Sequence, residues 1–238
     1  MKIAVAIVLM IIAYFIGNIS PATILARAAG KDITKEGSGN AGATNVLRVL
    51  GIKASIITLV IDVLKGFLAT LIGFFAAYAI AKQLFDPIFT PADSYATAVS
   101  AWCGLAVFLG HIWPLLFGFK GGKGVATALG VILATDYRAA LICLGVFFIV
   151  VIASRIVSLG SISAAVVFPF VFTWLIIKSG IVSSGEGTTI FIYRVMPILI
   201  PFIIVPIVLI IKHRENIKRI ARGEESKLSF RKDVNNIK

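Results

Sequence analysis

The sequence KASIITLVIDVLKGFLATLIGFFAAYAIA, residues 53–81, decides the fold class. Its only charged residues are Lys53, Asp62 and Lys65, and about 20 mainly apolar residues suffice to cross a hydrocarbon core as a helix. Six further charge-poor runs occur at residues 3–26, 94–117, 122–135, 139–153, 159–177 and 189–211. The sequence therefore predicts an all-α, polytopic integral membrane bundle of about seven transmembrane helices.

The composition excludes a soluble globular domain. Of the 238 residues, 59% are hydrophobic and 14% are charged, whereas soluble domains average roughly 45–50% and about 25%. The net charge of +12 is compatible with nucleic-acid binding, but polytopic proteins gather Lys and Arg in cytoplasmic loops for topological reasons alone. We therefore expect no nucleic acid as a partner. Cys103 and Cys143 lie in apolar runs without CxxC or Cys/His spacing, which argues against a disulfide framework or zinc.

The first apolar run has two interpretations. Met1 and Lys2, followed by IAVAIVLMIIAYFIG, have the charged start and apolar centre of a signal peptide. The apolar character continues past Pro21 to Ala26, however, and Arg27 follows. We therefore expect a retained first helix.

The number of spans decides which loops share a side of the membrane. With seven spans, residues 27–52, 118–123 and 154–158 lie on the same side as the tail after Lys212. Most of the 23 Lys and Arg residues fall in these segments, and the positive-inside rule places such loops in the cytoplasm. The amino terminus is then expected outside and the carboxyl terminus in the cytoplasm.

Two runs depart from a simple membrane helix. Residues 122–135 span about 21 Å as a helix, which is short for a hydrocarbon core of about 30 Å. Asp62 and Lys65 lie three residues apart, so a helix places them on one face. They either neutralise each other or mark a functional site, because ionisable groups inside a membrane are costly.

The first polar segment is GSGNAGATNVLR, residues 37–48. Its glycines permit close backbone approach, and the side chains between them supply hydrogen-bond donors and acceptors. A helix that begins near Thr44 places Asn45 and Arg48 on one face, and arginine binds phosphate through two parallel hydrogen bonds. These features are typical of an anion site, although a flexible interfacial loop has a similar composition. The candidates are Gly37, Ser38, Asn40, Gly42, Thr44, Asn45 and Arg48.

The second polar segment is GHIWPLLFGFKGGKGVAT, residues 110–127. It is not a Walker A loop, because Phe117 and Gly124 stand where that motif needs Gly and Ser or Thr. Successive glycine amides still form an anion-binding nest, and a helix beginning at Val125 directs its positive end toward it. The alternative is that the lysines only set topology, and His111 is either structural or catalytic. The candidates are Gly121, Gly122, Lys123 and Gly124.

Two further segments add polar residues on the same side. In SRIVSLGS, Arg155 and Ser158 have the spacing of one helix face, although serine is also common in membrane helices for packing. In HRENIKR, His213 and Asn216 share a face, and the remaining basic residues suit contact with lipid headgroups. The four segments predict one pocket without a carboxylate pair, metal cluster or Ser/His/Asp spacing. Its chemistry would depend on positioning and electrostatics around phosphate.

In this order the motifs resemble the bacterial membrane acyl-phosphate:glycerol-3-phosphate acyltransferases, the PlsY family. The resemblance runs to about Lys227 through GSGNAGATNVLR, DVLKG, GHIWPLLFGFKGGKGVAT, RIVSLGS and HRENIKRIARGEESK. It implies one transmembrane acyltransferase domain over residues 1–227 and a basic cytoplasmic tail over 228–238, in the bacterial inner membrane. The implied reaction transfers a fatty acyl group from acyl phosphate to the sn-1 hydroxyl of glycerol 3-phosphate. Its products are lysophosphatidate and inorganic phosphate, in an early step of phospholipid synthesis.

The resemblance also implies roles for residues. Acyl phosphate is associated with the glycine-rich second motif, and a substrate phosphate oxygen takes the hydroxyl proton, so no protein base, cofactor or metal is implied. The predicted catalytic residues are Ser38, Arg48, Lys123, Ser158, His213 and Asn216. The predicted substrate-binding residues are Gly37, Asn40, Gly42, Thr44, Asn45, Gly121, Gly122, Gly124 and Arg155. The NHxxxxD pair of other acyltransferases is absent, since the fifth residue after His111 is Leu116.

A transporter or channel for a phosphorylated solute would use similar glycines and cations. It would need matching groups on both faces, and no internal repeat is evident. The predicted external loops offer mainly the acidic residues Asp86, Asp93, Asp136 and Glu186. A lipid-scaffolding protein would have no need of phosphate nests. We therefore expect an enzyme whose partners are acyl phosphate, glycerol 3-phosphate and membrane lipid, with no particular oligomeric state implied.

Overall fold

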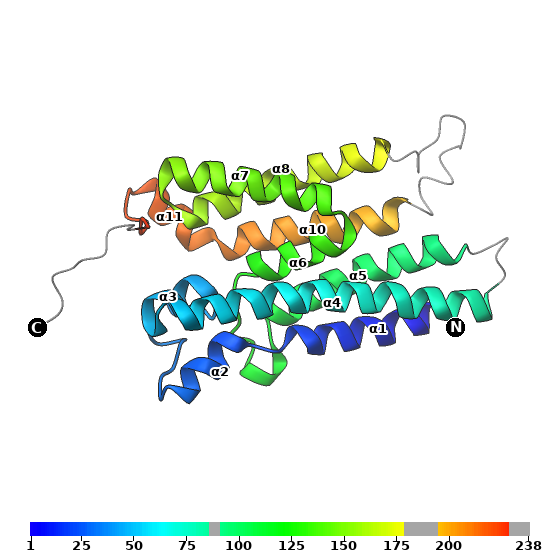
Figure 1. The fold of residues 1–238 in the computed structure, drawn as a ribbon, viewed down its shortest axis with the longest axis horizontal. Helices are drawn as coiled ribbons and strands as arrows, with labels where there is room; N and C mark the ends of the chain where they lie inside the picture. The colour runs from blue at the N-terminus through cyan, green and yellow to red at the C-terminus, as the bar shows by residue number, and fades with distance from the viewer. Residues whose placement is uncertain (86–90, 179–194, 229–238) are drawn as a thin grey trace, which may run out of the picture.

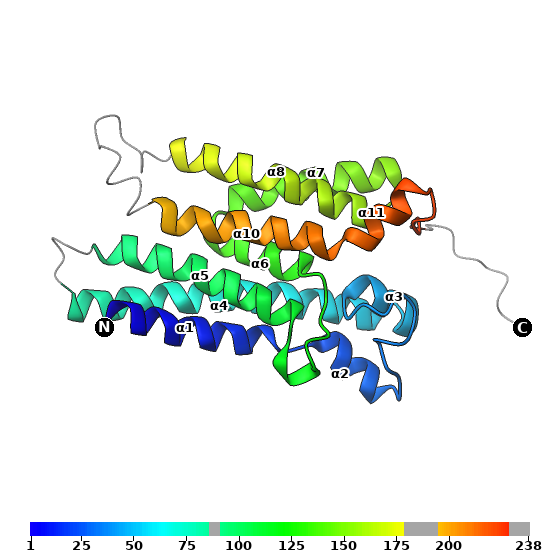
Figure 2. The ribbon, with the colours of Figure 1, turned by 180° about the vertical axis from the view of Figure 1, so that it is seen from behind.

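The protein is one elongated bundle of helices that lie roughly side by side (Figures 1 and 2). The structure is a computed structural model, and it describes residues 1–85, 91–178 and 195–228. Within these ranges no strand occurs. The helices are α1 (Lys2–Gly17), α2 (Pro21–Ala28), α3 (Ala43–Leu50), α4 (Ile52–Leu84), α5 (Ala92–Ile112), α6 (Val125–Thr135), α7 (Tyr137–Ser154), α8 (Val157–Lys178), α10 (Met196–Lys212) and α11 (Arg214–Ala221), with a 3₁₀ turn η1 (Leu115–Phe117).

Five segments in the described part are long and apolar enough to cross a membrane: α1 with α2, α4, α5 with η1, α7, and α8. The pair α10 and α11, bent by 53°, makes a sixth when it is counted as one span. Helix α6 has 11 residues, about 16 Å of helix, and is too short to cross alone. The all-α membrane bundle is confirmed. The exact count of about seven spans is not confirmed: among the described residues, the predicted run at 122–135 holds only this short helix.

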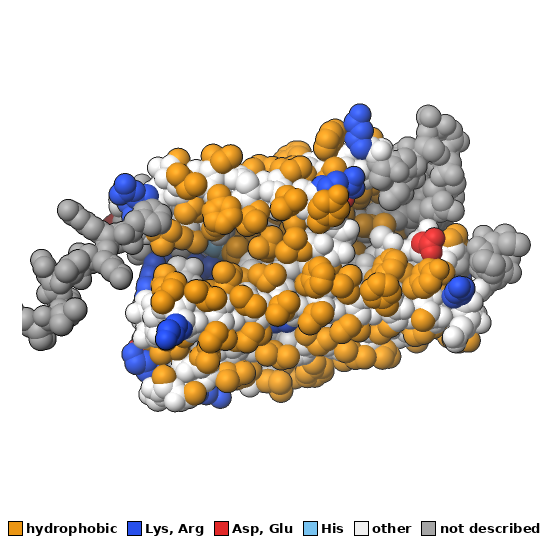
Figure 3. Space-filling model, viewed as in Figure 1, with side chains coloured by type: hydrophobic (Ala, Val, Ile, Leu, Met, Phe, Trp, Pro, Cys, Tyr) orange, Lys and Arg blue, Asp and Glu red, His pale blue; other side chains and the backbone are white. Residues whose placement is uncertain are grey.

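The outer surface of the bundle is apolar along most of its length (Figure 3). Large side chains such as Phe75, Ile152 and Phe170 are 62%, 72% and 73% exposed. A soluble monomer rarely exposes a continuous apolar surface of this extent. The surface therefore matches a lipid environment, as the predicted spans require.

Glycines let the helix backbones approach closely where the spans cross. A Cβ on Gly66 of α4 would lie 2.2 Å from the Thr127 carbonyl oxygen of α6, and one on Gly130 would lie 2.0 Å from the Val63 carbonyl oxygen. A Cβ on Gly110 of α5 would similarly lie 2.2 Å from a carbonyl oxygen of α1. Small residues at such crossings replace the hydrophobic driving force that is missing in lipid. They fix α6 and the carboxyl end of α5 against α4 and α1.

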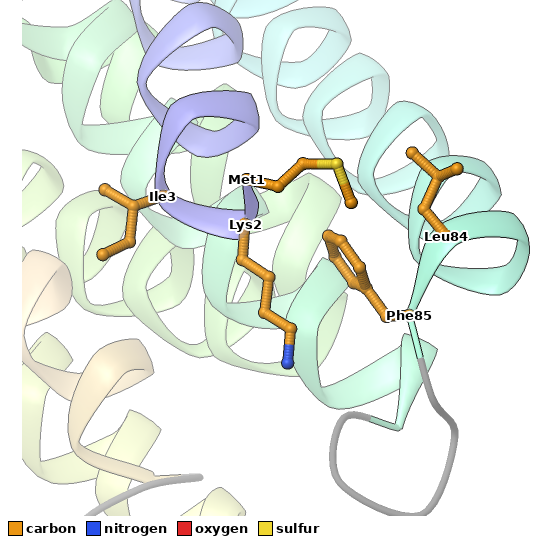
Figure 4. A pocket seen from close by; sticks show the side chains of 5 residues that line it. All are labelled: Met1, Lys2, Ile3, Leu84 and Phe85. Atoms are coloured by element: carbon orange, nitrogen blue, oxygen red, sulfur yellow. The ribbon is translucent and has the colours of Figure 1, made fainter.

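The polar segments meet at one end of the bundle, as the sequence predicts. Helices α2, α3 and α11 lie at this end, and the amino terminus lies at the other (Figure 1). The amino-terminal end has a hollow of about 470 Å³ lined by Met1, Lys2, Ile3, Leu84 and Phe85 (Figure 4). This hollow is mostly apolar and lies far from every predicted site residue.

Candidate active site

The first polar segment is held in shape by Asn45 at the start of α3. The Asn45 side chain is 1% exposed. Its Oδ1 accepts from the Ser38 backbone N–H at 2.8 Å, and its Nδ2 donates to the carbonyl oxygens of Glu36 at 3.0 Å and Ile33 at 3.2 Å. The amide is therefore engaged inside the loop, where Asn45 holds the backbone of the segment in shape, and its predicted contact with substrate stays a prediction. Arg48, one turn later, is exposed, so the two residues do not present one common surface.

The rest of the segment lies at the surface around this anchor. Gly37 and Gly39 adopt φ values of +60° and +69°, a conformation that favours glycine. A Cβ on Gly37 would lie 2.2 Å from Asn45 Oδ1, so a larger residue there would displace the anchor. The side chains of Ser38 and Thr44 are exposed at the same end of the bundle. Helix α3 begins at Ala43 after Gly42, close to the predicted start.

The second segment forms a loop packed on the end of α5. The Gly122 N–H donates to the His111 carbonyl at 3.2 Å, and a Cβ on Gly121 would lie 1.9 Å from that oxygen. Gly124 has φ +85° and precedes α6, and a Cβ there would lie 2.3 Å from the Phe108 ring. A Cβ on Gly122 would also lie 2.9 Å from the Ala41 carbonyl oxygen. The glycines are therefore required for packing, and they bring the two predicted segments together.

Lys123 joins this loop to the last polar segment. Its Nζ donates to Asn216 Oδ1 on α11, across 93 positions of the sequence. Asn216 Nδ2 donates in turn to Glu225 Oε1 at 2.6 Å, and Ser158 Oγ at the start of α8 donates to the same oxygen at 2.7 Å. Arg219 Nε donates to Glu225 Oε2 at 2.6 Å. Predicted residues from three segments are therefore linked in one hydrogen-bond network.

Glu225 is the residue that sequence reasoning missed. Its side chain is 7% exposed, and burial opposes its ionisation, but the hydrogen bonds from Ser158, Asn216 and Arg219 hold its pKa below the usual value. It is thus an ionised carboxylate at the centre of a cationic cluster. The signal available in the sequence was a lone pair of acids, Glu224 and Glu225, after ten residues rich in bases.

His213 lies at the bend between α10 and α11 and is 2% exposed. Its Nδ1 is 2.8 Å from the Leu209 carbonyl oxygen. Because a carbonyl only accepts, Nδ1 carries a proton, and Nε2 of the neutral ring is left as the acceptor. His213 and Asn216 are both buried on the inner side of the bend, as their predicted common face requires.

The electrostatics of the cluster centre on Lys123. Burial lowers the pKa of Lys123 to about 8, Glu225 opposes this shift, and the charges of Arg219, Arg48 and Lys212 add to it. The ammonium therefore lies among several cations and one carboxylate that is already paired. Such a cluster favours an incoming anion, because two or more negative charges would relieve the repulsion.

Arg155 and Ser158 do not share a helix face, contrary to the prediction. Helix α7 ends at Ser154, Arg155 has the left-handed φ of +61°, and α8 begins at Val157. The short break turns the chain, and it leaves Arg155 exposed and Ser158 buried. The Leu228 N–H donates to the Arg155 carbonyl at 2.7 Å, so Arg155 instead holds the segment that carries Glu225. In the described part of the chain, no three His, Cys, Asp or Glu residues are placed to hold a metal ion.

These features define an integral membrane protein with a cluster of cationic and polar side chains at one end of its helical bundle. The family described as Glycerol-3-phosphate acyltransferase matches residues 7–223. The chain therefore belongs to this family and is a membrane acyltransferase of phospholipid synthesis. The transporter alternative is set aside by this membership.

Curated relatives and solved structures are similar to this chain along nearly its whole length. A glycerol-3-phosphate acyltransferase of Clostridioides difficile (strain 630) is 39% identical and covers 98% of this chain and 100% of its own. One from Geobacter sulfurreducens is 38% identical, and the match covers 93% of this chain and 96% of that protein. The crystal structure of PlsY (YgiH), an integral membrane glycerol 3-phosphate acyltransferase, in its glycerol 3-phosphate form has a TM-score of 0.73 at 35% identity, with 94% and 96% covered. Its lysphosphatidic acid form has a TM-score of 0.70 at 36% identity, with 94% and 95% covered.

Proposed function

We propose that the chain transfers a fatty acyl group from an acyl phosphate to the sn-1 hydroxyl of glycerol 3-phosphate. The hydroxyl oxygen attacks the acyl carbon, the bond from that carbon to the phosphate oxygen breaks, and the hydroxyl proton passes to a phosphate oxygen. The products are lysophosphatidate and inorganic phosphate. The observation that carries the proposal is the Lys123–Asn216 contact, because it joins the glycine-rich loop to the distant segment at the end of the last span.

The donor phosphate is assigned to the two glycine-containing segments. Gly121 and Gly124 offer backbone N–H groups without side chains, the Gly122 N–H is bonded to the His111 carbonyl, and the first segment meets this loop at Ala41. Backbone N–H groups in such a turn bind anions, and they need no reorganisation as charge develops on the leaving group. The proposed donor-binding residues of the first segment are Gly37, Ser38, Asn40, Gly42 and Thr44, shaped by Asn45.

The acceptor is assigned to the network around Lys123. The ammonium of Lys123 and the guanidinium of Arg48 would neutralise the phosphate of glycerol 3-phosphate. Ser158 and Asn216 supply a hydroxyl and an amide to the glycerol hydroxyls, and His213 Nε2 accepts from the reacting hydroxyl and orients it. In our proposal Arg155 supports this subsite through its backbone.

The reaction is proposed to be assisted by substrate, without a protein carboxylate as base. Glu225 is the acid within the network, and its Oε1 accepts from Ser158 and Asn216 while its Oε2 accepts from Arg219. A carboxylate with a lowered pKa and both oxygens engaged is a poor proton acceptor. An acyl phosphate carries an anionic phosphate next to the attacked carbon, so a proton acceptor arrives with the donor.

The site is proposed to face the cytoplasm, at the inner membrane of a bacterial cell. The end of the bundle that carries it also carries exposed cations on α2, α3 and α11, and such ends remain inside by the positive-inside rule. Labelling tests this: a cysteine introduced as Lys35→Cys should react with an impermeant maleimide in inverted vesicles and stay protected in intact cells. Cys103 and Cys143 are buried and leave little background. Labelling in intact cells would place the site outside.

The activity is tested on purified protein in lipid nanodiscs. Phosphate release should require both acyl phosphate and glycerol 3-phosphate, with lysophosphatidate detected by mass spectrometry and acyl-CoA inert as a donor. Lys123→Met should abolish release, while Lys53→Met, an exposed lysine at the start of α4, should not change it. Turnover with acyl-CoA but not with acyl phosphate would refute the proposed donor.

A further inference from the structure

A cluster of three ionisable side chains lies buried beneath the glycine-rich loop. Asp62 and Lys65 of α4 and His111 of α5 are 2%, 4% and 7% exposed. Lys65 Nζ is 2.7 Å from Asp62 Oδ1, and His111 Nδ1 is 3.3 Å from the same oxygen. The Asp62–Lys65 pair has the one-face arrangement predicted from the sequence, and His111 joins it. None of the three belongs to the network around Lys123.

The hydrogen bonds of Lys65 determine the tautomer of His111. An ammonium has three protons and no lone pair, so it only donates. Lys65 Nζ donates to the Ile19 carbonyl at 2.8 Å, lies 2.8 Å from His111 Nδ1, and forms an ion pair with Asp62 Oδ1 at 2.7 Å. His111 Nδ1 must therefore offer its lone pair to Lys65. In the neutral ring the proton then resides on Nε2, which becomes a donor.

Nε2 is aimed at the glycine-rich loop. A Cβ built on Gly122 would lie 2.2 Å from Nε2 and 2.8 Å from the adjoining ring carbon. The ring cannot move away freely, because Lys65 holds its Nδ1 and the backbone carbonyl of His111 accepts from the Gly122 N–H. In the described part of the chain, no hydrogen bond is found for Nε2. A nearly buried N–H donor thus faces the glycine-rich turn at Gly122.

We infer that His111 is a further anion-binding residue of this loop, which donates its Nε2–H to a phosphate oxygen bound over Gly121 and Gly122. Asp62 and Lys65 act as positioning residues that hold the ring and fix its tautomer. A neutral donor suits this place, because it adds a hydrogen bond to phosphate without adding another cation near Lys123. Identification of that anion as the phosphate of the acyl donor rests on the proposed function.

The buried position of the ion pair supports a role beyond packing. A buried pair does not stabilise a fold more than apolar residues of the same volume would, and intramembrane ionisable groups mark functional sites by default. Here the pair also bonds the short connection between α1 and α2 through the Ile19 carbonyl. It therefore holds the imidazole of α5 against α4 and this connection.

The first test uses the unmodified protein. The chain has two histidines, so ¹⁵N-labelled histidine gives two ring systems, and the spectrum of His213→Gln assigns the remaining one to His111. We expect the Nε2–H tautomer for His111 and a saturable downfield shift of that proton as inorganic phosphate is added. An Nδ1–H tautomer, or a proton that does not respond to phosphate, would overturn the inference.

The second test compares two substitutions of His111. Asparagine places an acceptor near Nδ1 for Lys65 but cannot reach the loop, whereas glutamine extends an N–H to about the position of Nε2. Because a hydrogen bond to a charged group is replaced by none, His111→Asn should weaken phosphate binding by about tenfold or more, measured as phosphate-dependent thermal stabilisation. His111→Gln should recover part of the loss. Equal phosphate affinity in wild type and His111→Asn would leave the cluster a purely structural role.

The outcome separates this inference from the proposed donor. If wild-type protein fails to use acyl phosphate, the proposed function falls, while the phosphate-dependent shift of His111 can still be measured. If acyl phosphate is used and His111→Asn retains the wild-type KM for it, the inference falls alone. The KM for glycerol 3-phosphate should be unchanged in His111→Asn, since that substrate is assigned to the other subsite.

Discussion

Replacing Lys123 by methionine removes one charge and keeps a side chain of similar length. Lys123 is the cation that connects the glycine-rich loop to Asn216, so the substitution removes a donor from the proposed glycerol 3-phosphate subsite where it adjoins the glycine-rich loop. Loss of one preorganised donor to developing charge costs about 10²–10³ in rate, and we expect a loss of at least this size in kcat/KM. Lys123→Arg should recover part of it, because it restores the charge with a different geometry.

The same residue predicts a pH dependence with a definite sign. The pKa of Lys123 is lowered to about 8 by burial, opposed by Glu225 and reinforced by neighbouring cations. The ammonium is present below this pKa and is lost as the pH rises through it. One unit above the pKa about one tenth of the protein keeps the charge, so kcat/KM should be about tenfold lower near pH 9 than at its plateau. Bound phosphate favours the ammonium, so kcat should fall only at higher pH.

The assay is initial-rate phosphate release across this pH range, with intrinsic fluorescence as a check that the protein remains folded. Lys53→Met serves as the control for loss of a surface charge at the same end of the bundle. A kcat/KM profile that stays flat through pH 8 and 9 would contradict the assigned pKa. A Lys123→Met enzyme within about threefold of wild type would refute the role itself, because removal of a catalytic donor costs far more.

Three further predictions concern other parts of the site. Glu225→Gln removes the negative charge that raises the pKa of Lys123, so the alkaline limb of kcat/KM should move to lower pH, and an unmoved limb would contradict the electrostatic link. Asn45→Ala leaves one N–H and two carbonyls without their partner and should destabilise the fold by about 2 kcal/mol or more, read as a lowered midpoint of thermal unfolding. Gly122→Ala places a Cβ 2.2 Å from a histidine ring nitrogen and should raise the KM for acyl phosphate at least about tenfold, as loss of a hydrogen bond to a charged group would. Gly145→Ala, where a Cβ meets nothing within 4 Å, is its control.

Most of the fold could be predicted because lipid leaves the chain few choices. Backbone polar groups have no partner in hydrocarbon, so an apolar run of sufficient length must become a helix, and the runs at 53–81 and 159–177 became α4 and α8. Each apolar run takes the chain from one end of the bundle to the other, so the number of runs between the polar segments then placed these segments at the same end. The short run at 122–135 did not form a full span, since only α6 follows the loop after η1. The segments after it nevertheless lie at the end that the count predicts.

The site was predictable in its residue types but not in its long-range pairing. Ser158 and Glu225 are 67 positions apart, and nothing in their spacing indicates that they meet. Asn45 has the same spacing from Arg48 as a pair on one face, yet tertiary packing turned its amide into the loop. Arg155 is not a helical neighbour of Ser158 because two residues, the left-handed Arg155 and Ile156, separate α7 from α8. Each of these outcomes depends on contacts between segments, which local periodicity does not encode.

The glycines link membrane packing to phosphate binding. Gly66 and Gly130 bring α4 and α6 into backbone contact, and Gly110 brings α5 against α1, so close packing fixes the helix ends on both sides of the loop between α5 and α6. That loop can then present Gly121 and Gly122 toward an anion with little conformational freedom left to lose. Replacing a glycine at a helix crossing by alanine should therefore also affect the proposed anion site. The added Cβ would separate the two helices and loosen that site, even though the glycine itself lies within the apolar interior. In this fold, close helix packing is a condition for the preorganisation on which the proposed reaction without a protein base would depend.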